Sequence, residues 1–208
     1  MDSAAELHGD HDVTDVPSIV RGAVLLGLFE SVMVLLLSLA SRFLSGPLET
    51  ALLAILLLLG LAPVTILPGI WTRARSIEGI AGAAGIGLAA AFVFLLIDVV
   101  LLQHIGTYTN RWHQIGGSNW WYHPIWWMAG TFLPWLGAWM LANQAGRSGR
   151  ISAPAAFGTA VGFAVAVALA GILIGFPGAG WNVATFGVAF LPGLALATAL
   201  SALGTRRT

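Results

Sequence analysis

The sequence predicts an all-α, multi-pass membrane protein, folded as a bundle of six transmembrane helices. Hydrophobic residues make up 58% of the 208 positions and charged residues only 9%, whereas a soluble domain carries about a quarter charged residues. Six apolar stretches also reach the roughly 20 residues that a helix needs to cross a bilayer. These stretches are 18–43, 48–71, 78–104, 121–144, 152–175 and 182–204.

The first three predicted helices are separated by residues that end helices. The apolar run 18–43 stops at LSGP (44–47), whose glycine and proline are typical of turns. The leucine-rich run 48–71 stops at TRARS (72–76), which adds two arginines. The third run, 78–104, begins with many glycines and alanines and ends with larger apolar residues.

The last three predicted helices are also separated by residues that end helices. The tryptophan-rich run 121–144 comes after a more polar segment, 105–120, which we expect to form a long loop. QAGRSGR separates this run from 152–175, and FPGAGW separates 152–175 from 182–204. Glycine, proline, serine and arginine are the residues expected at such helix ends.

Residue size predicts how the helices pack. GIAGAAGIGLAAA (79–91) and FGTAVGF (157–163) carry small residues three or four positions apart, which lets helices approach closely in lipid. The fourth helix carries large residues at the same spacing on one face, and we expect these to fill the space against the small faces. The large face consists of Trp120, His123, Trp127, Thr131, Trp135 and Trp139.

The placement of arginine predicts the orientation. With six spans, both termini lie on one side, and seven of the nine arginines fall on that side, leaving Arg42 and Arg111 on the other. Arginine and lysine are enriched on the cytoplasmic side, so both termini are expected to be cytoplasmic, with the loop 105–120 outside an inner (plasma) membrane. Residues 1–16 are predicted to be an acidic disordered tail, and residues 17–208 the transmembrane domain.

Missing residue types exclude several chemistries. The chain has no cysteine, which excludes disulfides, thiolate metal sites and covalent c-type haem. All nine basic residues are arginine, so a lysine Schiff base, as in retinal proteins and pyridoxal-phosphate enzymes, is impossible. The formal net charge of zero offers no basic surface to nucleic acid. No catalytic motif is present, which favours a non-enzymatic role.

Two acidic residues lie inside predicted spans. Glu30 falls near the middle of the first helix and Asp98 in the outer third of the third helix. A charge at the bilayer centre costs about 2.5–3.5 kcal/mol on insertion scales, so such residues often mark function. Both are candidates for a proton or cation site. The alternative for Glu30 is a protonated carboxyl hydrogen-bonded to a neighbouring helix or to a partner subunit.

Histidines gather near the predicted outer boundary. His104 ends the third helix, His113 lies in the loop and His123 begins the fourth helix. These histidines, with Asp98 orienting one imidazole, could bind copper, zinc or non-haem iron, and two of them on facing helices could hold a haem or another tetrapyrrole. The alternative is an interfacial belt, which is the usual place of tryptophan and tyrosine in membrane proteins.

The tryptophans can also be interpreted either as interface residues or as part of a binding site. Trp112, Trp120 and Trp121 are interpreted as interface anchors or as contacts with a partner. Trp135 and Trp139, on the same face as Trp127, lie too deep for an anchor and require packing, a lipid or a pigment.

Three functions agree with these observations. The first is a non-catalytic membrane subunit of a larger assembly, such as an electron-transfer or light-harvesting complex, with membrane-protein partners or further copies of the chain. The second is a small proton, ion or solute transporter using Glu30 and Asp98. The third is a metal- or haem-binding redox protein using the outer histidines. The sequence identifies no cofactor.

Overall fold

The computed structural model describes residues 12–115 and 124–203, and these residues form helices and no strands. A short helix, α4 (Asn110–Gln114), lies between the longer ones, and a π-helical turn, η2 (Asp98–Leu102), extends the third helix. The long helices are α1 (Val16–Phe43), α2 (Gly46–Trp71), α3 (Ile77–Ile97), α5 (Pro124–Ser148), α6 (Ala153–Leu173) and α7 (Val183–Ala202).

Helices occupy all six ranges that the sequence predicts. Five of the described helices are long and apolar enough to cross a membrane: α1, α2, α3 together with η2, α6 and α7. α5 is 25 residues long, but its tryptophans, glycines and polar final turns make it less apolar. The described chain is therefore an all-α, multi-pass bundle with five membrane-capable helices.

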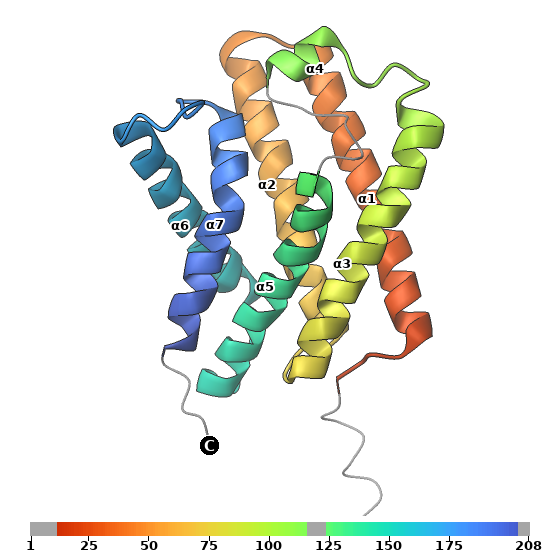
Figure 1. Cartoon of the computed structure of the whole chain (residues 1–208), viewed down its shortest axis with the longest axis vertical. Coiled ribbons are helices and arrows are strands. Elements are labelled where there is room, and N and C mark those ends of the chain that lie inside the picture. The colour runs from red at the N-terminus through yellow and green to blue at the C-terminus, as the bar shows by residue number, and fades with distance from the viewer. Residues whose placement is uncertain (1–11, 116–123, 204–208) are drawn as a thin grey trace, which may run out of the picture.

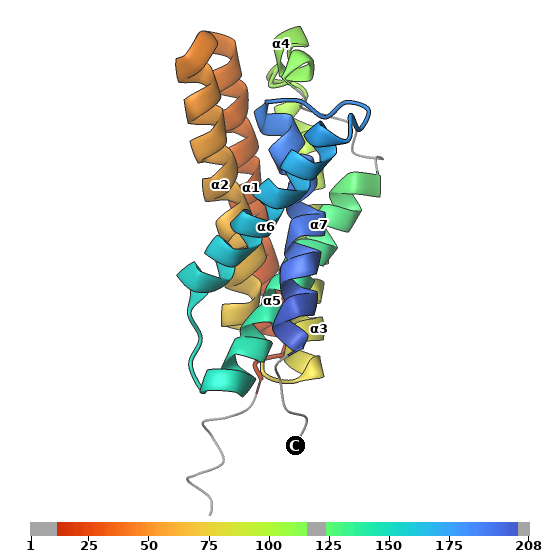
Figure 2. The ribbon, with the colours of Figure 1, turned by 90° about the vertical axis from the view of Figure 1, so that its left-hand side faces the viewer.

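The first four long helices form a ring, and the last two form a hairpin beside it (Figures 1 and 2). α1 packs along α3, α3 along α5, α5 along α2, and α2 along α1. α6 and α7 pack on each other and reach the ring mainly through α7 against α5. Both ends of the described chain lie at one end of the bundle, here called the terminal end, and α4 lies at the other, the α4 end (Figure 1).

Small residues bring the ring helices together. A Cβ atom built on Gly87 of α3 would overlap the carbonyl oxygen of Gly130 and the ring of Pro134, both in α5. The glycine-rich face of 79–91 therefore lies at a helix contact, as the sequence predicts. Gly130 and Pro134 make this contact. On the tryptophan face of α5, Trp135 packs against the cluster that contains Ile80 and Ala83 of α3, whereas Trp139 remains 38% exposed. The close contact between α3 and α5 thus has a glycine on each side.

Asp12 fixes the start of the described chain to the start of α3. Its carboxylate accepts hydrogen bonds from the backbone N–H groups of Arg75 at 3.0 Å, Ser76 at 3.1 Å and Gly79 at 3.0 Å, and from the Ser76 hydroxyl. Partial burial acts to raise the pKa of the Asp12 carboxyl, but these hydrogen bonds together lower the pKa below its ordinary value. Asp12 lies within the predicted acidic tail, and it holds the described end of that tail, residues 12–15, against the terminal end of the ring.

Candidate functional site

A cavity of about 200 Å³ lies inside the ring, between α1, α2, α3 and α5. Its wall is almost entirely apolar, and among the described residues Glu30 is the one lining residue with a charged side chain. Apolar cavities of this kind are typical of sites for small ligands, in which a few polar groups fix the orientation. The lining residues are Phe29, Glu30, Met33, Val34, Leu37, Leu56, Leu57, Gly60, Leu61, Val64, Ala91, Phe94, Trp126, Ala129, Gly130 and Leu133.

Glu30 lies at the midpoint of α1, far from either helix end. Its side chain is partly buried and lines the cavity. Within the described part of the chain, its carboxyl has no hydrogen-bond or ion-pair partner. A carboxylate in such a place is costly unless it takes up a proton or meets a cation. Glu30 is therefore a candidate site for a proton or a cation.

Aromatic residues line the same cavity as Glu30. Phe94 of α3 and Trp126 of α5 contact each other with ring centroids 5.6 Å apart, and Phe29 precedes Glu30 on α1. All three residues line the same cavity as Glu30. The cavity wall thus combines one carboxyl group with three aromatic residues, a residue type whose π face attracts cations.

Asp98 lies outside this cavity and has partners of its own. It begins the π-helical turn η2 and is 2% exposed. Its carboxylate accepts hydrogen bonds from the Tyr108 hydroxyl and, at 2.8 Å, from Nε2 of Gln103. Burial, followed by the hydrogen bond to Asp98, raises the pKa of the Tyr108 hydroxyl above its ordinary value. Asp98 therefore ties the connection after α3 to the helix end, so Glu30 and Asp98 do not form one site.

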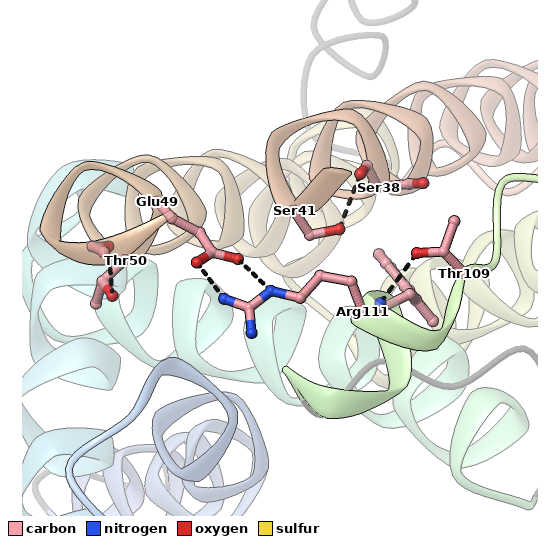
Figure 3. A network of polar contacts seen from close by, with 8 residues as sticks. Ser38, Ser41, Glu49, Thr50, Thr109 and Arg111 are labelled. Carbon is pink, nitrogen blue, oxygen red and sulfur yellow. Dashed lines mark hydrogen bonds and ion pairs between the residues drawn. The ribbon is translucent and has the colours of Figure 1, made fainter. Parts of the chain in front are cut away.

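A second polar group closes the α4 end of the ring (Figure 3). The guanidinium of Arg111, in α4, binds both carboxylate oxygens of Glu49, in the first turn of α2, with Nε 3.1 Å from one of them. Glu49 is 3% exposed. Nearby, the Ser38 hydroxyl donates to the Thr107 carbonyl, and Arg42 donates to the carbonyl of Gly106. These contacts fasten the α3–α4 connection across the ends of α1 and α2.

The Glu49–Arg111 pair is the polar contact that sequence reasoning missed. The sequence does contain a signal for this pair. Glu49 is the one acid between residues 31 and 77, and Arg111 is one of two arginines predicted on the outer side. Their pairing depends on α4 folding back over α2. Because Glu49 and Arg111 are far apart in the sequence, the sequence alone does not reveal that contact.

The described histidines do not assemble a metal site. His104 and His113 are both exposed, and no group of three or more histidine, aspartate or glutamate residues within 12–115 and 124–203 could hold a metal ion. His123 lies outside the described residues. The predicted histidine cluster is therefore not supported by the described part of the chain.

The predicted tryptophan positions divide into different environments. Trp112 is 4% exposed and packs with Val34, Phe94 and neighbouring apolar residues. Trp127 is partly buried in the same region, whereas Trp135 and Trp139 contact each other, with ring centroids 5.7 Å apart, farther along α5. Trp120 and Trp121 lie outside the described residues. The described tryptophans thus do not form one continuous belt.

Comparisons with protein-family models, with curated proteins and with solved structures each find no match to this chain. The functional argument therefore depends on the cavity and its residues.

Proposed function

We propose that the protein is a small membrane transporter in which Glu30 takes up and releases the transported proton from within the central cavity. The observation that carries this proposal is the isolated carboxyl of Glu30 on the wall of an apolar cavity between four helices. In this proposal α5 also spans the bilayer, giving six spans in an inner (plasma) membrane with both termini cytoplasmic.

The surroundings of Glu30 and Asp98 assign them different roles. A group that exchanges protons in a transport cycle has to be reached by the transported species, and Glu30 lines a cavity large enough for this. Asp98 is hydrogen-bonded to Tyr108 and Gln103 and does not line the cavity. We therefore assign proton exchange to Glu30 alone and a structural role to Asp98.

Proton flux in vesicles tests this function. Purified protein reconstituted in liposomes with an entrapped pH-sensitive dye is expected to dissipate an imposed pH gradient. Glu30→Gln keeps the shape of the side chain but cannot exchange a proton at this position, so its rate is expected to fall to that of protein-free liposomes.

The matched control is Glu78→Gln, an exposed acid in the first turn of α3 that does not line the cavity. This variant is expected to retain the wild-type rate. Flux through Glu30→Gln equal to that of the wild type, with the same amount of inserted protein, would contradict the proposed function.

A second candidate function, a subunit of a larger membrane assembly, is favoured by one face of α6. Gly158 and Gly162 lie four residues apart in this apolar helix, and a Cβ atom built on either would meet no other atom within 4 Å. Such pairs of glycines commonly form helix–helix contacts in membranes. Within the described bundle, this face is not covered by another helix.

The size of the particle in a mild detergent tests this candidate. The wild type is expected to run as an assembly larger than one chain, and Gly158→Leu/Gly162→Leu is expected to run as a monomer because leucines keep the partner helix away. Gly85→Leu, at an open position of α3, is the control and should leave the assembly intact. A monomeric wild type would reject the subunit function.

A further inference from the structure

We propose that the central cavity binds a small aromatic cation, with the positive group against Glu30 and the ring among the apolar residues. This inference depends on the proposed function for its site and adds the chemical class of the ligand. It would make the protein an exchanger, in which the cation and the proton alternate at one carboxyl group.

The volume of the cavity sets the size of the ligand. An apolar cavity of about 150 Å³ holds one benzene molecule, and the cavity in the ring measures about 200 Å³. The space is therefore sufficient for one aromatic ring with a small substituent. Met33, which has a flexible side chain, lies on the wall and can adapt to the shape of the ring.

The charge and the polarity of the wall select an organic cation. A carboxylate favours a positive ligand, and the described residues of the cavity wall include no arginine and no charged group besides Glu30. Ca²⁺ and Mg²⁺ require about six or more oxygen ligands, whereas only Glu30 supplies side-chain oxygens here. An alkylated ammonium group spreads its charge and needs no such coordination shell. The cost of removing water from the ammonium group is offset by the Glu30 carboxylate and by the aromatic residues that line the same cavity.

The aromatic residues add to this selection. Quaternary ammonium groups bind over the faces of tryptophan, phenylalanine and tyrosine, with a gain of about 2 kcal/mol or more when the site excludes water. Phe29, Phe94 and Trp126 line the cavity together with Glu30. A cation beside Glu30 therefore lies in the same cavity as three rings. The remaining wall, formed by leucine side chains, suits the ring of the ligand.

Two ligands of the same shape test the charge directly. Benzyltrimethylammonium and neopentylbenzene differ only in that a neutral carbon replaces the charged nitrogen. Binding to the purified protein in nanodiscs is measured by the change in intrinsic tryptophan fluorescence, with Trp126 on the cavity wall, and by equilibrium dialysis. The wild type is expected to bind the cation at least about tenfold more tightly than its neutral counterpart.

Two variants locate the binding. Glu30→Gln is expected to weaken cation binding by about tenfold or more and to leave neopentylbenzene unchanged. Gly60→Leu is expected to weaken both ligands, because Gly60 lines the cavity, and its Cβ position lies 3.8 Å from the end of Met33, so that a larger side chain fills the space. Gly60→Leu retains Glu30, so the two variants separate the effect of the charge from the effect of the cavity volume. If one variant fails to fold, the other still tests the inference.

The outcomes separate this inference from the proposed function. Equal binding of both ligands, or cation binding that is unchanged in Glu30→Gln, overturns the inference. If proton flux still depends on Glu30 in that case, the proposed function stands with another substrate. If the cation binds as expected and proton flux is absent even with benzyltrimethylammonium supplied on the opposite side of the membrane, the inference stands and the transport function is wrong.

Discussion

Replacing Gly137 with alanine is expected to destabilise the protein by about 3 kcal/mol or more, at the upper end of the usual cost of overpacking. Gly137 of α5 faces Thr65 of α2, and a Cβ atom built on it would overlap the carbonyl oxygen of Thr65. A backbone oxygen in a helix cannot rotate away as a flexible side chain could. Relief therefore requires α2 and α5 to separate, and this loosens one side of the cavity.

The measurement is the free energy of unfolding from a titration with sodium dodecyl sulfate in mixed micelles. Gly146→Ala is the matched control, because it lies on the same helix and its Cβ atom would meet nothing within 4 Å. Alanine is a better helix former than glycine by up to about 1 kcal/mol, so this control should be as stable as the wild type or more stable. A Gly137→Ala protein as stable as the control would mean that the two helices are not in close contact.

The second large effect is expected for Arg111→Met. This change leaves Glu49, which is 3% exposed, without its ion-pair partner. Removing one member of a buried pair costs about 3–5 kcal/mol, but the side chain of Arg111 is itself 45% exposed, so water reduces the penalty. We expect a loss of about 2 kcal/mol in the free energy of unfolding and detachment of α4 from α2.

A double variant distinguishes the pair from its separate members. Glu49→Gln/Arg111→Met removes both charges and is expected to recover most of the stability lost by Arg111→Met, because no unpaired carboxylate remains. Arg150→Met, at an exposed arginine of the α5–α6 connection, serves as the control for loss of a surface charge. Simple addition of the two single effects in the double variant would show that Glu49 and Arg111 do not interact.

The positions of the helices could be predicted from the sequence because hydropathy and helix breakers act locally. Each of the six predicted ranges contains a helix, and the boundaries of α1 and α2 agree within two residues. Glu30 could be identified for the same reason, since an acid inside a long apolar run is unusual wherever the helix packs. The cavity could not be predicted, because it depends on which four helices form the ring.

The contacts between segments that are distant in the sequence could not be predicted. Asp98 was identified as a candidate beside Glu30, but the π-helical turn directs it to Tyr108 and Gln103. Trp112 is interpreted from the sequence as an interface anchor or a partner contact, and its burial beside Phe94 could not be predicted. In both cases the local pattern was visible and the deciding factor was the path of the α3–α4 connection. That path depends on tertiary contacts such as Glu49–Arg111.

The order of helices around the ring has a consequence for biosynthesis. α1 and α2 are adjacent in the ring, and α3 and α5 together complete it on the other side. The ribosome makes α5 last of these four, so the wall around Glu30 is incomplete until α5 (Pro124–Ser148) has been synthesised. Until then the nascent chain has to retain an acid-bearing α1 in the membrane without its final neighbours. The insertion machinery, or lipid that tolerates a protonated carboxyl, therefore has to accommodate Glu30 before α5 arrives.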